Sequence, residues 1–206
     1  MNKFLIGALG TLFVMPAMAS DSFFYASLAG LRGHERFTNI QVNIFDTGTG
    51  TWTNIPQHNL SDNVWGGSAA VGYGFWNIRG EIDLTMRQKA RVNNATIKSD
   101  SLMANLYYDF NNDTRFTPFV GIGAGASWVK LHIENLDLSN TKTNFAAQGI
   151  AGIGLHVVDG LHLNLSYRYA YLGHVALRDT VDGGGILSVR ARDTSSEFLV
   201  GASYRF

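Results

Sequence analysis

The feature that most constrains the fold of this chain is a two-residue alternation of apolar and polar side chains in segments of about ten residues. Residues 77–87 show it most clearly, because Ile82 and Leu84 alternate with Glu81 and Asp83. A β-strand places successive side chains on opposite faces, so this pattern predicts a strand with one apolar and one charged face.

Eight such segments follow one another: residues 23–32, 64–73, 77–87, 101–110, 116–129, 145–157, 161–171 and 195–206. Each is about as long as a tilted strand that crosses a bilayer, which needs roughly 9–11 residues. After residue 19, no stretch reaches the roughly 18 consecutive apolar residues of a transmembrane helix.

The connections between these segments alternate in length. They are long at residues 34–62, 88–100, 130–144 and 172–194, and short at residues 74–76, 111–115 and 158–160. Outer-membrane barrels have short periplasmic turns and long extracellular loops, whereas a soluble sandwich has no reason to follow this parity. We therefore predict an all-β, eight-stranded antiparallel up-and-down transmembrane β-barrel, with residues 42–45 and 51–55 extending its first long hairpin.

The start of the chain predicts export. Lys3 precedes an apolar run over residues 4–15, and Ala17-Met18-Ala19 forms a small-residue cleavage site. The run is short for a spanning helix, which favours a signal peptide over a membrane anchor. We predict that residues 1–19 are a cleaved signal peptide and that residues 20–206 form the barrel domain, in the outer membrane of a Gram-negative bacterium.

Composition excludes two further classes of protein. The chain has no cysteine, so it is not a disulfide-stabilised secreted scaffold. Its 16 basic residues are balanced by 16 acidic residues, and this balance gives no basic face for nucleic acid.

The end of the chain resembles a known family. Its last strand alternates large apolar or aromatic residues with others and ends on an aromatic residue, at Phe198, Val200, Ala202, Tyr204 and Phe206. This resembles the C-terminal signature of outer-membrane β-barrels, and the resemblance implies recognition by the barrel assembly machinery. Residues 77–84, 105–110, 117–125 and 167–169 are similar to the opacity-type surface proteins, which share their barrel with the membrane domain of OmpA.

Seven charged side chains are expected to point into the barrel: Arg79, Glu81, Asp83, Asp109, Arg168, Glu197 and Arg205. Charges at membrane depth are costly, so these groups should pair with one another or line water. Two interpretations stay open. The groups form either a structural network that fills the narrow lumen of eight strands, or a narrow path for ions.

The long connections carry the candidate binding residues. Residues 88–100 contain Lys89, Arg91 and Lys98 with no acid before residue 100, and Arg87 lies just below them. We expect this anion-binding loop to hold phosphates of lipopolysaccharide or an acidic host glycan. Apolar side chains of the first connection, such as Phe37, are either anchors for a partner or packing contacts with other loops.

The sequence shows no catalytic, cofactor or metal-binding motif. His162 and Ser166 share a strand face, but same-face neighbours along a strand are too far apart for one to activate the other. We predict a non-enzymatic surface protein that contacts outer-membrane lipid, lipopolysaccharide or host ligands through its extracellular loops, as an adhesin or surface antigen that supports envelope integrity. The alternatives are a small porin-like channel, a lipid A-modifying barrel enzyme and a purely structural protein.

Overall fold

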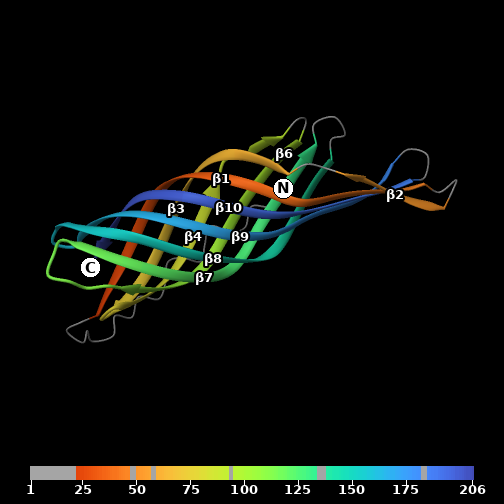
Figure 1. Cartoon of the computed structure of the whole chain (residues 1–206). Helices are drawn as coiled ribbons and strands as arrows, with labels where there is room; N and C mark the ends of the chain where they lie inside the picture. Colours follow the sequence, from red (N-terminus) through yellow and green to blue (C-terminus); the bar gives the residue numbers. More distant parts are fainter. Residues whose placement is uncertain (1–21, 47–49, 57–58, 93–94, 134–137, 182–184) are drawn as a thin grey trace, which may run out of the picture.

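The computed structural model describes residues 22–46, 50–56, 59–92, 95–133, 138–181 and 185–206. Within them, eight strands close into one antiparallel barrel, because each pairs with its neighbour along the chain and β10 pairs with β1 (Figure 1). The barrel strands are β1 (Ser22–Asp46), β3 (Leu60–Phe75), β4 (Ile78–Arg87), β6 (Ala95–Asp109), β7 (Phe116–Ile133), β8 (Leu138–Val158), β9 (Leu161–Val181) and β10 (Gly185–Arg205). Two shorter strands, β2 (Thr51–Pro56) and β5 (Ala90–Val92), pair with β1 and β6.

Two sequence predictions concern the signal peptide and transmembrane helices. The predicted signal peptide, residues 1–19, lies outside the described residues. Among the described residues, no helix is long enough and apolar enough to span a membrane.

The two faces of each barrel strand differ as the alternation predicts. On β4, Ile82 and Met86 point outward and are about half exposed, while Asp83 and Arg87 point inward and are buried. Ile122 of β7 and Val200 of β10 are also more than half exposed on the outer wall. A wall this apolar suits lipid on all sides rather than water.

One end of the barrel is closed by short turns and is called here the short-turn end. Residues 76 and 77 join β3 to β4, and residues 159 and 160 join β8 to β9. Gly160 has a φ of 81°, and a Cβ there would lie 2.9 Å from the carbonyl oxygen of Arg205, so a larger residue would be strained in this turn.

At the opposite, long-hairpin end, the structure corrects the sequence prediction. The four long connections are mostly strands rather than loops, because the hairpins keep pairing well beyond the predicted strand ends. β9 and β10 stay paired up to Val181 and Gly185, with one register shift between Asp193 and Thr194. The extension predicted over residues 42–45 and 51–55 is confirmed, since β1 and β2 pair from Gln41 with Pro56 to Asp46 with Thr51.

Above the barrel the strands separate into two sheets. The long extension consists of residues 172–181, 185–193, 37–46 and 51–56, in the order β9-β10-β1-β2. The short extension consists of residues 90–92, 95–100, 128–133 and 138–146, in the order β5-β6-β7-β8. Figure 1 shows β1, β2, β9 and β10 reaching beyond the ends of β6, β7 and β8.

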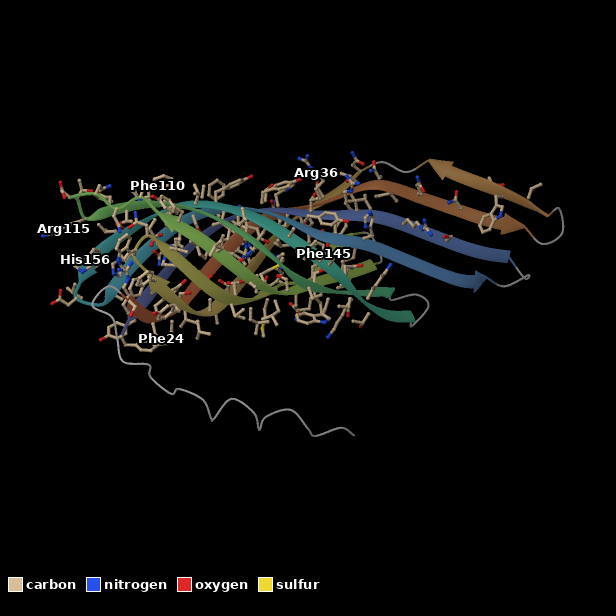
Figure 2. All side chains as sticks on the ribbon, turned by 90° about the horizontal axis from the view of Figure 1, so that it is seen from below. Phe24, Arg36, Phe110, Arg115, Phe145 and His156 are labelled. Atoms are coloured by element: carbon tan, nitrogen blue, oxygen red, sulfur yellow. The ribbon has the colours of Figure 1, made fainter. Side chains whose placement is uncertain are left out.

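Outward aromatic side chains gather near both ends of the apolar wall. Trp65, Phe145 and Tyr169 lie toward the long-hairpin end, and Trp76, Tyr108, Phe110, Tyr204 and Phe206 lie toward the short-turn end. Figure 2 shows Phe110 and Phe145 at these two levels. Aromatic belts at two heights are typical of a barrel held at two membrane–water interfaces.

Candidate functional site

The lumen near the short-turn end is held by one arginine–carboxylate pair among aromatic rings. Arg79 of β4 donates to both carboxylate oxygens of Asp109 on β6, at 2.7 and 2.8 Å. Its guanidinium also lies over the rings of Tyr107 and Phe119, 4.8 and 5.2 Å from their centroids. Bidentate pairing and ring stacking both fix the plane of the guanidinium.

Glu81 lies two residues after Arg79 on β4, and its carboxylate accepts hydrogen bonds from neutral donors. The hydroxyls of Tyr25 and Tyr107 donate to it at 3.0 Å each, and the amide of Asn105 donates at 3.2 Å. These donors come from β1 and β6, so the carboxylate ties three strands together across the lumen.

The middle of the lumen is organised by Glu197 of β10. Its two carboxylate oxygens accept from two arginines on other strands, Arg87 at 2.5 Å and Arg168 at 2.6 Å. All three side chains are at most 2 % exposed. Arg168 also donates to the hydroxyl of Thr85 at 3.1 Å and contacts Asp83 at 3.5 Å, so β4, β9 and β10 are joined.

The sequence predicts that Arg87 belongs to an anion-binding loop, and this prediction is wrong. Arg87 is the last residue of β4, and strand alternation directs its side chain into the lumen, where Glu197 binds it. Of the other expected loop residues, Lys89 is exposed and Lys98 forms an ion pair with Asp100 at 2.9 Å. The side chain of Arg91 lies outside the described part of the structure.

Two further expectations concern the end of the chain. Arg205 lies over the ring of Phe23, 4.1 Å from its centroid, and forms no ion pair within the described residues. It therefore contributes to the lumen by stacking rather than by charge pairing. In the C-terminal signature, Phe198, Val200, Tyr204 and Phe206 point outward; recognition by the assembly machinery stays a prediction.

A pair of buried carboxyl groups lies above the Glu197 cluster, and the sequence did not predict it. Glu35 of β1 and Asp193 of β10 are both fully buried, in segments predicted to be loops. Ser99 donates to Asp193 at 3.0 Å, while neither oxygen of Glu35 has a hydrogen-bond partner among the described residues. The outward neighbours at this level, such as Arg36, are polar, so the pair lies above the apolar wall.

The environment of this pair favours the neutral acid. Burial, followed by repulsion from Asp193, raises the pKa of Glu35, and burial raises the pKa of Asp193. The positive charge of Arg87 lowers both pKa values but does not cancel the effect of burial, which is larger, and the negative charge of Glu197 raises both pKa values further.

An apolar cap closes the lumen at the foot of the two extensions. Phe37 of β1 and Ala191 of β10 pack against Ile97 of β6 and Val129 of β7, and all four are buried. Phe37 is thus a packing contact between the extensions rather than an anchor for a partner. Below the cap, an internal space of about 70 Å³ lies beside Tyr25, Glu81 and Arg168, enough for a few water molecules.

Other polar side chains of the lumen are engaged in packing. The rings of His156 and His162 lie 5.0 Å apart at the short-turn end, and Asn164 donates to Ser203 at 3.0 Å. Among the described residues, no group of three or more potential ligands is placed to hold a metal ion.

The Glu197 cluster is open to a direct test. We expect Arg168→Leu to lower the free energy of unfolding by about 3–5 kcal/mol, because it removes one partner from a buried ion-pair network. Urea unfolding in lipid vesicles, followed by tryptophan fluorescence, measures the change. The matched control is Arg115→Leu, at an exposed turn position, which should change stability by less than about 0.5 kcal/mol. Equal effects of both variants would contradict the network.

The raised pKa of Glu35 predicts how stability depends on pH. Between the ordinary pKa of a glutamate and the raised value in the folded protein, the unfolded chain loses a proton that the barrel keeps, so stability falls as pH rises. Glu35→Gln removes this loss. We expect the variant to match the wild type near pH 4 and to exceed it by about 1–3 kcal/mol near pH 9. A constant difference across this range, measured by the same unfolding method, would contradict a buried neutral acid.

Comparison with known proteins agrees with this architecture. The family described as outer membrane protein beta-barrel domain matches residues 5–206. Outer membrane protein PagN of Salmonella typhimurium is 29 % identical over 175 residues, which cover 69 % of this chain and 73 % of PagN.

Two solved structures share the fold at low sequence identity. Neisserial surface protein A superposes with a TM-score of 0.59 at 18 % identity, covering 89 % of this chain and 97 % of that protein. OprG from Pseudomonas aeruginosa superposes with a TM-score of 0.58 at 11 % identity, covering 87 % and 95 %. With the closed barrel and its lipid-facing wall, the family match shows that this chain belongs to the outer membrane protein β-barrel domain family, small barrels of the Gram-negative outer membrane.

Proposed function

We propose that the protein is a non-enzymatic surface protein whose long-hairpin end lies outside the cell and contacts host ligands or lipopolysaccharide. The observation that carries this proposal is the contrast between the two parts of the molecule. The lumen is filled with paired charges and capped, whereas two sheet extensions project from one end of the barrel. The part available for molecular contact is therefore the projecting part.

The long extension is the better candidate for binding a partner protein or glycan. β2 is the edge strand of this sheet, and an edge strand can pair with a further strand from a partner. Trp52 on β2 is 53 % exposed, and large aromatic side chains often anchor interfaces.

The rival function, a small channel, has less support. An ion would have to pass Phe37 and Val129 in the cap and then the Glu197 cluster, where the charges already neutralise each other. We expect purified protein in planar bilayers to give no discrete conductance steps. Reproducible steps that change with Arg168→Leu would contradict the filled lumen and favour the channel.

Replacing the tip of the long extension tests the proposed contact. Gln41 and Pro56 are paired, so an Asn-Gly turn can replace residues 41–56 and leave the barrel intact. The matched control replaces residues 131–140, the tip of the short extension, where Leu131 pairs with Asn140. We expect the first variant to lose most of its binding to cultured host cells and the control to keep it. Unchanged binding by the first variant, with folding verified by heat-modifiable gel mobility, would contradict the proposal.

A further inference from the structure

The outer wall of the protein becomes strongly basic where the long extension leaves the barrel. Arg36 of β1 and Arg190 and Arg192 of β10 are exposed on this outward face, together with His34 and His174. Arg192 pairs in register with Thr38 on one side and with His174 on the other, so these side chains lie on adjacent strands. This set of residues is called here the basic wall. Figure 2 shows Arg36 at the foot of the long extension.

Among the described residues of β1, β9 and β10 around the basic wall, no carboxylate lies on the outward face. On residues 32–41, 167–174 and 190–196, the acids are Glu35 and Asp193, and both point inward and are fully buried. Among the described residues, Arg36, Arg190 and Arg192 form no ion pair. Strand alternation has thus placed the acids inside and the arginines outside, which leaves unneutralised positive charge on the outer surface.

The basic wall contains a recess that could receive an anionic group. The recess has a volume of about 280 Å³ and opens to the outside. Arg36 and Arg192 provide its cationic lining beside His34, and the hydroxyls of Thr38 and Ser196 provide further donors, whereas the hydroxyl of Thr194 donates to the backbone carbonyl of Arg36. A guanidinium group can donate two parallel hydrogen bonds to the oxygens of a phosphate, and hydroxyl groups can donate further hydrogen bonds to it.

The height of the basic wall identifies the source of the anion. Tyr169 and Phe198, immediately below on β9 and β10, are more than half exposed and belong to the lipid-facing surface. The recess therefore faces sideways at the level of the lipid headgroups rather than upward from the tip. A group that reaches it sideways belongs to a molecule standing beside the barrel in the membrane.

The apolar wall next to this region has room for a lipid chain. Below Arg32 on the same outward side of β1, Leu28 and Gly30 line a shallow groove with Gly67 and Met86 of the neighbouring strands. The recess lies over β1, β9 and β10 and the groove over β1, β3 and β4, so the two features share strand β1. A molecule with a phosphorylated head and acyl chains matches both features.

We propose that the basic wall binds the phosphate groups of a glycolipid in the surrounding outer leaflet, of the lipopolysaccharide type. This inference rests on the proposed function, since it needs the long-hairpin end to lie outside the cell. It assigns the glycolipid to a site different from residues 88–100, on which the sequence analysis places it. Anionic lipid here would neutralise the arginines and fix the depth of the barrel in the membrane.

The test compares binding of purified lipopolysaccharide to the detergent-solubilised barrel and to the double variant Arg36→Ala/Arg192→Ala. We expect the variant to bind about 30-fold more weakly at low salt, because two guanidinium groups that contact anionic lipid are lost. The matched control is Lys130→Ala/Lys142→Ala, which removes two exposed cations from the short extension. The control should bind like the wild type.

Two further probes identify the chemistry and the source of the ligand. Dephosphorylated lipopolysaccharide should bind the wild type and the Arg36→Ala/Arg192→Ala variant equally weakly. Inorganic phosphate and soluble heparin should compete poorly, because neither occupies the apolar groove. Equal lipopolysaccharide binding by wild type and variant would overturn the proposal, as would equal losses in both double variants or full competition by heparin. The residue 41–56 replacement, which leaves the basic wall in place, should still bind lipopolysaccharide, so failure of this site and failure of host-cell contact are separate results.

Discussion

Charged side chains lie inside this protein at the depth of the membrane because partners within the lumen hold them. Glu197 accepts from Arg87 and Arg168, and Arg79 pairs with Asp109, so the narrow interior contains balanced charge rather than an open bore. This pairing lets every barrel strand expose an apolar outer side to lipid. The same contacts join strands that are distant in sequence, and they fill the space through which a channel would have to conduct. The closed barrel, the contrast between its apolar outer face and charged inner face, and the filling of the described lumen therefore have one physical origin.

The barrel itself could be predicted from the sequence because its signal is local and repeated. Period-two alternation places Ile82 outside and Asp83 inside without knowledge of any partner strand, and the parity of connection lengths orders the hairpins. The extensions could not be predicted in the same way. Above the membrane both faces of a strand can be polar, so the alternation that marks residues 77–87 fades in residues 172–194, although the pairing of β9 with β10 continues.

The misassigned residues show a second limit. Arg87 sits beside Lys89 in a basic stretch, and only its inward direction at the end of β4 separates a lumen ion pair from a surface cation. Glu35 and Arg36 show the opposite case, in which adjacent residues of a predicted loop point to opposite sides of a strand. The alternation that continues from Leu31 through Phe37 places Glu35 inside and Arg36 outside. Which buried acid remains without a hydrogen bond depends on side chains from other strands, and no local pattern contains that information.

The central claim is that the apolar side of each strand faces lipid and the charged side faces the lumen. Because the chain has no cysteine, a single spin label can be attached through Ile122→Cys on the outer wall and compared with one through Arg36→Cys at the foot of the long extension. In lipid vesicles, collisions with oxygen should dominate for the label at residue 122, and collisions with a water-soluble nickel complex should dominate at residue 36. Ready access of the nickel complex to the label at residue 122 would contradict the claim.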